Sequence, residues 1–168
     1  SRLSQSFRFV FGKVKALSIG SIVGSLIGII PGAGGQIAGL VAYDQTKKVS
    51  RNQSNYGKGE PEGIVAAESA NNSMVGPSLI PLLTLSIPGS PTAAVLLGGL
   101  LIHGIFPGHE IFVAENTKPV VWTFIDSLIL AQIFMLIIGL FLSRHSGWIM
   151  RIPDNYMAVG ILMLAVFG

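Results

Sequence analysis

The stretch Ile30-Pro31-Gly32-Ala33-Gly34-Gly35-Gln36 places one proline and three glycines inside a long uncharged apolar run. Proline lacks the amide hydrogen that a helix needs, and glycine adopts backbone angles that other residues avoid, so this stretch should interrupt a helix. A second interruption of this kind, Ile87-Pro88-Gly89-Ser90-Pro91-Thr92, lies in another uncharged apolar run. Non-helical backbone inside a bilayer is tolerated only where it is buried in protein or lines a cavity. If these runs lie in a membrane, the two breaks therefore indicate a binding site.

The composition indicates a membrane protein. Half of the residues are hydrophobic, only 11% are charged, and the mean hydropathy is +0.64, whereas a soluble domain carries about 25% charged residues. Residues 16–43 and 69–102 contain no charge, and residues 119–143 contain only Asp126. Each window can supply the ~20 apolar residues of a crossing helix. A large soluble helical core would need charged outer faces, which these windows lack.

The charge pattern limits the partners that the chain can have. A net charge of +3, spread along the loops, does not favour nucleic acid, and its sign fits the lysine and arginine excess of cytoplasmic loops. Without cysteine there is no disulfide framework and no thiolate metal site. Residues 1–15 combine basic and phenylalanine side chains, so we expect them to lie along the membrane lipid at the cytoplasmic surface. The sequence starts with serine and stops inside an apolar segment, so we expect a piece of a longer protein.

The predicted fold is an all-α membrane protein, a multi-span helical bundle with a re-entrant hairpin and a discontinuous transmembrane helix. In residues 16–43, Gly20, Gly24 and Gly28 recur every fourth position, so another helix can approach this face closely. Basic residues flank the segment on both sides, which places both ends on the cytoplasmic side. We therefore expect a re-entrant hairpin with 31–35 at its tip, and one broken crossing is the alternative.

The rest of the chain forms one transmembrane domain with the first segment. Residues 60–106 should contain a helix that starts near Pro61, followed by two half-helices that meet as one discontinuous span. An ordinary span is expected over 119–143, and 156–168 should begin a truncated span. Asp126 is a functional candidate because it is ionisable within a span, although a position near the interface explains it better. Trp148 fits an interfacial anchor.

Several motifs resemble the large membrane subunit of tripartite tricarboxylate transporters. They occur in order over most of the chain: Gly28–Gly35, Ala42–Tyr43, Tyr56–Gly59, Glu62–Asn72, Leu79–Leu85, Ile87–Ser90 and His103–Gly108. The sequence departs from the family pattern at His109-Glu110 and at Ser69 and Ser73. The resemblance implies the C-terminal half of a multi-pass protein of the bacterial inner membrane. It also implies secondary transport of a dicarboxylate or tricarboxylate, with a small membrane subunit and a periplasmic solute-binding protein as partners.

Both breaks are followed by a new helix, whose first amides have no partner within the helix and favour an anion. Transporters commonly bind their substrates at such half-helix ends. The predicted substrate-binding residues are Ala33, Gly34, Gly35, Gln36, Gly89, Ser90 and Thr92. Carbonyl groups at Pro31 and Ile87, with the side chains of Asn71 and Asn72, are the predicted ligands of a coupling ion, since hard cations take oxygen ligands. Sodium is the candidate ion, and no other metal or cofactor is expected.

Two other classes of function remain as alternatives. A channel for ions or anions would use the re-entrant glycine-rich loop as a filter, but the two breaks are dissimilar. An enzyme is disfavoured because His103, His109 and His145 have no ligand spacing and no nucleophile or phosphate-loop motif is present. The sequence leaves open which carboxylate is carried and whether sodium ions or protons drive the transport.

Overall fold

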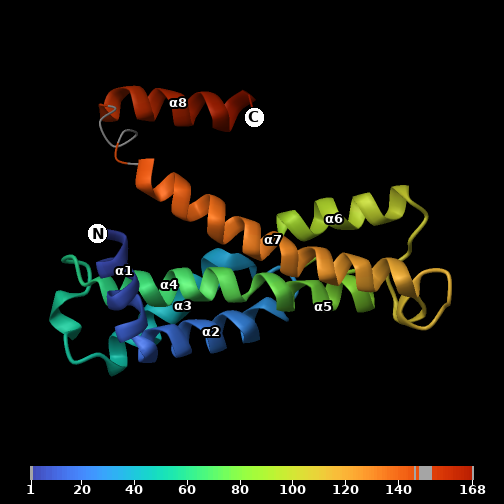
Figure 1. Ribbon diagram of the computed structural model, residues 1–168, viewed down its shortest axis with the longest axis horizontal. Helices are drawn as coiled ribbons and strands as arrows, with labels where there is room; N and C mark the ends of the chain where they lie inside the picture. Colours follow the sequence, from blue (N-terminus) through green and yellow to red (C-terminus); the bar gives the residue numbers. More distant parts are fainter. Residues whose placement is uncertain (1, 146, 148–152, 168) are drawn as a thin grey trace. The chain divides into compact units, whose positions relative to one another are not determined.

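The computed structural model describes residues 2–145, 147 and 153–167. Every regular element in these residues is helical, which confirms the predicted all-α class, and Trp148 lies outside them. The helices are α1 (Arg2–Gly12), α2 (Val14–Gly28), α3 (Gly34–Val49), η1 (Gln53–Asn55), α4 (Pro61–Ser73), α5 (Val75–Leu85), α6 (Pro91–Ile102), η2 (His109–Phe112), α7 (Lys118–His145) and α8 (Asp154–Phe167) (Figure 1). The chain divides into two compact units, residues 1–121 and 122–168, which we describe separately.

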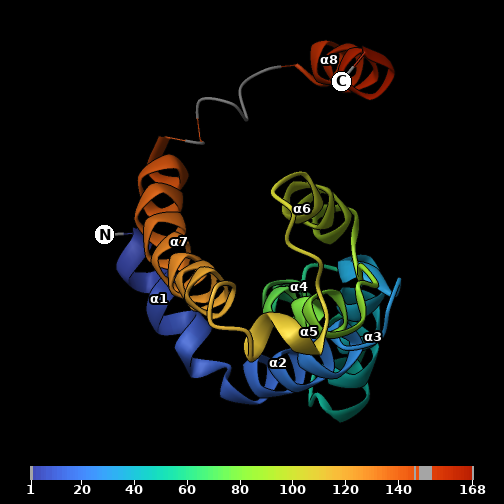
Figure 2. The same ribbon diagram turned by 90° about the vertical axis from the view of Figure 1, so that its right-hand side faces the viewer.

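Three helices, α2, α3 and α4, lie side by side and form the core of the first unit (Figures 1 and 2). Lys15 Nζ at the start of α2 donates to the Val49 carbonyl at the end of α3 at 3.0 Å, so these two helices are antiparallel. The core side chains are mostly alanine: Ala16, Ala38, Ala42, Val65, Ala66, Ala70 and Met74. Because these side chains are small, the helix backbones approach one another closely.

The glycines of α2 bring this helix into close contact with α4. Gly20, Gly24 and Gly28 are all buried. A Cβ atom on each of them would meet the backbone of α4 or the residue after it, at Ala66, Ala70 and Met74 in turn. The order of these contacts shows that α2 and α4 run in the same direction. The predicted close approach of a helix to this glycine face is therefore confirmed.

The first break folds α2 back onto α3 as a helical hairpin. The interruption spans the residues between Gly28 and Gly34, as the proline and glycines predict. The 15 residues of α2 rise only ~22 Å, less than the ~30 Å core of a bilayer. The hairpin is thus observed, while its re-entrant placement in a membrane stays a prediction.

Helix α4 begins as the sequence predicts, with Pro61 at its first position and Glu60 as the N-cap. Its axis passes almost directly into α5 through Met74, whose backbone is itself helical. Pro77 has no amide hydrogen to donate to the preceding turn, which accounts for an interruption at this point. The junction of α4 and α5 therefore lies next to a weakened turn.

Helix α5 ends at Leu85, and the next residue, Ser86, adopts a left-handed conformation with φ of +56°. The chain then turns back. A Cβ on Gly89 would lie 3.4 Å from the Cβ of Ser78. Ser78 lies eight residues, or ~12 Å of helix, before Ser86. After α6, the Pro107 carbonyl accepts a hydrogen bond from Ser86 Oγ at 2.7 Å. Helix α6 therefore runs in the same direction as α5, which differs from the end-to-end arrangement expected for a discontinuous span.

Helix α7 carries the clearest membrane signal in the described residues. Its stretch Lys118–Arg144 has 27 residues with a hydropathy of 2.4, long and apolar enough to cross a bilayer. A second span is possible by length and composition only if α2 and the preceding Gln5–Gly12 helix, bent by 69°, are counted together. Asp126 lies on α7 and is exposed within the second unit. Helix α8 is a shorter apolar helix.

Candidate substrate site at the two helix breaks

Both breaks of the first unit converge on the α4–α5 junction. Met74 is 4% exposed; its backbone lies against Gly28, and its sulfur lies against Gly35. One turn further along, Ser78 lies against Gly89. A Cβ on Gly89 would also lie 3.6 Å from the Gly28 carbonyl oxygen. The second break therefore contacts the end of α2, directly before the first break.

The first break presents unpaired backbone amides. Gly32 and Gly34 have φ of +77° and +69°, a region that favours glycine. The Ala33 amide donates to the Ile30 carbonyl at 3.3 Å, and none of the described side chains caps the start of α3. The amides of Gly34 and Gly35 have no hydrogen-bond partner among the described residues. The side chain of Gln36 lies outside the described part of the structure.

Asn71 lies beside these amides. A Cβ on Gly35 would overlap Asn71 Oδ1, so glycine is needed for the approach of this side chain. Asn71 and Gly35 line an open groove of about 430 Å³ between α3 and α4. The groove also contains the carboxylate-bearing Glu68 and the aromatic Tyr43. Asn71 therefore lies beside the first break, and its role as a ligand of the coupling ion stays a prediction.

The second break is more fully hydrogen bonded. Ser90 is the N-cap of α6, and its Oγ accepts from the Ala93 amide at 3.1 Å. The Ile87 amide donates to the Pro81 carbonyl at 3.2 Å. Gly89 is buried, whereas Thr92 is exposed at the start of α6. The Ser90 hydroxyl therefore has a structural role that the sequence analysis did not include, although Ser before Pro at a helix start is a recognisable cap signal.

Not every predicted residue faces the two breaks. Asn72 Nδ2 donates to the Glu68 carbonyl at 2.9 Å, and Asn72 lines a different groove, between α2 and α4. The structure thus separates the two asparagines that the sequence analysis grouped. Conversely, Met74 and Ser78 connect the breaks but were not predicted, because their type and spacing resemble ordinary core positions.

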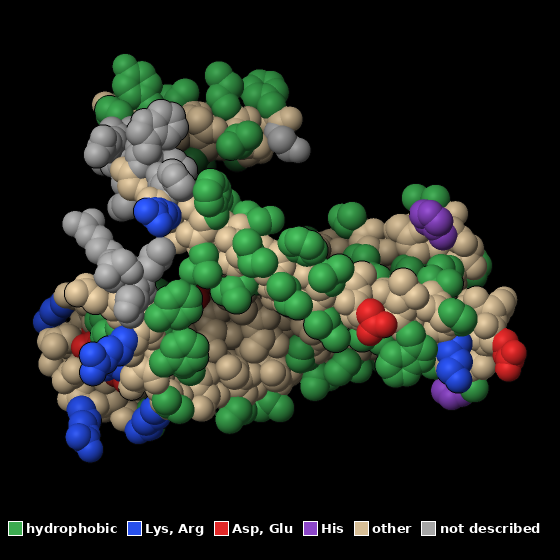
Figure 3. Space-filling view, in the orientation of Figure 1, with side chains coloured by type: hydrophobic (Ala, Val, Ile, Leu, Met, Phe, Trp, Pro, Cys, Tyr) green, Lys and Arg blue, Asp and Glu red, His purple; other side chains and the backbone are tan. Residues whose placement is uncertain are grey.

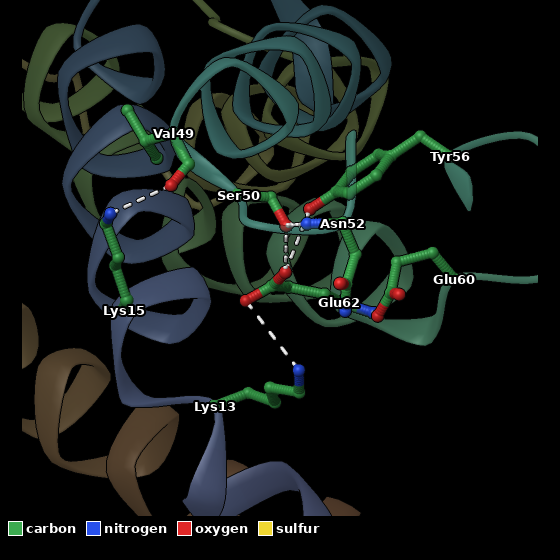
Figure 4. Close-up of polar contacts among 8 residues, drawn as sticks. All are labelled: Lys13, Lys15, Val49, Ser50, Asn52, Tyr56, Glu60 and Glu62. Atoms are coloured by element: carbon green, nitrogen blue, oxygen red, sulfur yellow. Dashed lines mark hydrogen bonds and ion pairs between the residues drawn. The ribbon is translucent and has the colours of Figure 1, made fainter. Parts of the chain in front are cut away.

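A polar cluster holds the opposite end of the bundle together (Figure 4). Glu62 accepts from Ser50 Oγ at 2.6 Å and from the Tyr56 hydroxyl at 3.4 Å, and Lys13 Nζ lies 3.9 Å from its carboxylate. Burial, together with the negative charges of Glu62 and Glu60, raises the pKa of Tyr56 despite the opposing hydrogen bond with Ser50. Figure 3 shows lysine and arginine side chains gathered at this end of the first unit. The cluster fixes the α3–α4 loop against the bend between α1 and α2.

The structure shows a helical protein whose two helix breaks lie close together in its first unit. The sequence profile of the tripartite tricarboxylate transporter TctA family matches residues 2–168. The chain belongs to this family, which makes it part of a membrane protein.

Two relatives from Agrobacterium vitis are each 33% identical to the chain. One is described as an uncharacterized 52.8 kDa protein in the TAR-I ttuC' 3'region; the match covers 98% of this chain and 32% of the relative. The other is described as an uncharacterized protein in the TAR-II ttuC' 3'region, with 86% and 59% covered. The chain thus spans about a third of the length of the first relative and somewhat more than half of the length of the second. No solved structure matches the sequence.

Proposed function

We propose that this chain forms part of a secondary active transporter subunit that moves a small dicarboxylate or tricarboxylate across the bacterial inner membrane. The convergence of both breaks on the α4–α5 junction is the observation that carries the proposal. Transporter sites form where interrupted helices meet, because non-helical backbone there can bind the substrate. Family membership supports the same class of function.

The substrate carboxylates would be held by neutral donors. The unpaired amides of Gly34 and Gly35 lie at the positive end of the α3 dipole, which favours an anion. At the second break, Ser90 Oγ accepts from Ala93, so its own proton stays available for a carboxylate oxygen. Neither break contains lysine or arginine. Binding by amides and hydroxyls alone is weaker than binding by a guanidinium, which permits release of the substrate.

The partners and the energy source belong to the same proposal. A periplasmic solute-binding protein delivers the carboxylate, a small membrane subunit completes the complex, and an ion gradient drives transport. Asn71, which lies beside Gly35, is a proposed ligand of the coupling ion at the first break. The carbonyl groups of Pro31 and Ile87 remain predicted ion ligands on sequence grounds.

The proposal is tested with the full-length complex in proteoliposomes. Saturable carboxylate uptake that requires an ion gradient and the binding protein is the expected result. Ion current that needs neither the binding protein nor a carboxylate would instead indicate a channel. Citrate, tartrate and succinate, each tested with and without sodium, would identify the class of substrate and the driving ion.

A further inference from the structure

The first unit has a second groove, between α2 and α4. It has a volume of about 600 Å³, and five polar residues line it among apolar ones: Ser21, Glu68, Ser69, Asn72 and Ser73. Its described lining includes no lysine or arginine. The hydrogen bonds of these five residues determine which of their atoms remain available to a ligand.

The serine hydroxyls donate their protons to protein atoms. Ser69 Oγ donates to the Leu17 carbonyl at 3.1 Å. Since Ser69 has only one proton, the 3.0 Å contact between Ser21 and Ser69 requires Ser21 to donate to Ser69. Ser73 Oγ donates to α2 or to its own helix, with the Gly20 carbonyl at 3.4 Å and the Ala70 carbonyl at 3.3 Å. The oxygen lone pairs of these serines are left as acceptors.

The two remaining polar residues also present acceptor oxygens. Asn72 directs its amide nitrogen to the Glu68 carbonyl at 2.9 Å, which leaves Oδ1 as its free polar atom. The Glu68 carboxylate, one helical turn earlier on the same face, has no ion pair or hydrogen bond with any described residue. The polar lining is therefore composed of acceptor oxygens and carries a single negative charge.

We propose that the α2–α4 groove binds one sodium ion between the Glu68 carboxylate and Asn72 Oδ1, with serine oxygens of the groove completing the shell. Hard cations take oxygen ligands, and a single carboxylate balances one positive charge. This site keeps Asn72 from the ion ligands expected from the sequence but does not use Pro31, Ile87 or Asn71. The inference rests on the proposed transport function for its role, but the binding itself can be measured independently.

Glu68 also connects the cation to the substrate. It lines both the α2–α4 groove and the α3–α4 groove beside Gly35 and Asn71. An ionised Glu68 repels a substrate carboxylate in the α3–α4 groove, and a bound sodium ion removes that repulsion. By linkage, the substrate must strengthen sodium binding by the same factor that sodium strengthens substrate binding.

The test uses the purified full-length complex and its thermal unfolding temperature as a function of NaCl, with choline chloride keeping the ionic strength constant. We expect saturable stabilisation by sodium. Glu68→Gln should raise the sodium concentration for half-maximal stabilisation by on the order of tenfold or more, and Asn72→Ala should raise it less. The matched control is Glu115→Gln, which removes an exposed carboxylate outside the groove and should leave the sodium response unchanged.

A second measurement tests the coupling. In the wild-type complex, sodium should strengthen stabilisation by citrate, whereas in Glu68→Gln citrate should stabilise equally with and without sodium. An unchanged sodium response in Glu68→Gln would overturn the site. Stabilisation that depends on pH and not on sodium would overturn the sodium assignment. Carboxylate uptake without any sodium response would reject this inference while leaving the transport function intact.

Discussion

Replacing Gly24 with alanine should destabilise the protein, although alanine is the better helix former. A Cβ at this position would lie 2.8 Å from Ala70 Cα, compared with 3.4–4 Å for ordinary contact. It would also overlap the Ala70 carbonyl oxygen and Ser73 Oγ. Helices α2 and α4 would have to separate locally by about 1 Å, and overpacking of this kind costs about 1–3 kcal/mol.

The sign of the effect makes the experiment decisive. Helix propensity alone predicts that Gly→Ala stabilises by up to about 1 kcal/mol. Gly98→Ala is the matched control, because Gly98 lies inside α6 and a Cβ there would meet nothing within 4 Å. Thermal unfolding of the full-length protein in detergent should show Gly24→Ala below the wild type and Gly98→Ala at or above it. Equal stability of the two variants would refute the described contact of α2 with α4.

Three further predictions follow from individual contacts. Gly89→Val should abolish carboxylate uptake while the protein still inserts in the membrane, because the branched side chain would displace Ser78 and the end of α2; normal uptake would contradict the composite site. Ser90→Ala should lower stability by about 1 kcal/mol through loss of the α6 N-cap, measured by chemical unfolding, with Ser90→Asn as the variant that retains it. The raised pKa of Tyr56 stabilises the fold below the ordinary tyrosine value of 10.0, and this contribution is lost as pH rises through the folded-state pKa. Tyr56→Phe should therefore unfold with less dependence on alkaline pH than the wild type, and an unchanged pH profile would argue against the cluster around Glu62.

The sequence predicts local features of this fold well. Glycines at every fourth position lie on one helical face, so their contact with another helix follows from helix geometry alone. Proline and glycine likewise mark the breaks, and Glu60-Pro61 marks the start of α4, because these residues act on their own backbone. Each of these features depends on residues that are close in sequence.

The direction of the chain after a break depends on distant contacts, and the sequence did not predict it. Pro88 and Pro91 require an interruption but do not determine whether α6 continues from the end of α5 or starts again near Ser78. The return depends on the left-handed Ser86, its bond to Pro107 and the contact of Gly89 with Ser78. Similarly, Asn71 and Asn72 differ by about 100° around α4, and only the positions of α2 and α3 show that they face separate grooves.

A disulfide between positions 78 and 89 tests most directly whether the second break packs on the α4–α5 junction. In the double variant Ser78→Cys, Gly89→Cys, the two Cβ atoms would lie 3.4 Å apart, close to the ~3.5–4.5 Å of natural disulfides. The chain itself contains no cysteine, and any cysteine elsewhere in the full-length protein would be replaced. We predict rapid cross-linking with copper phenanthroline, loss of carboxylate uptake, and recovery on reduction. Absence of cross-linking at 78 and 89, or equal cross-linking of the control pair Ser78→Cys, Gly99→Cys, would contradict the convergence of the two breaks.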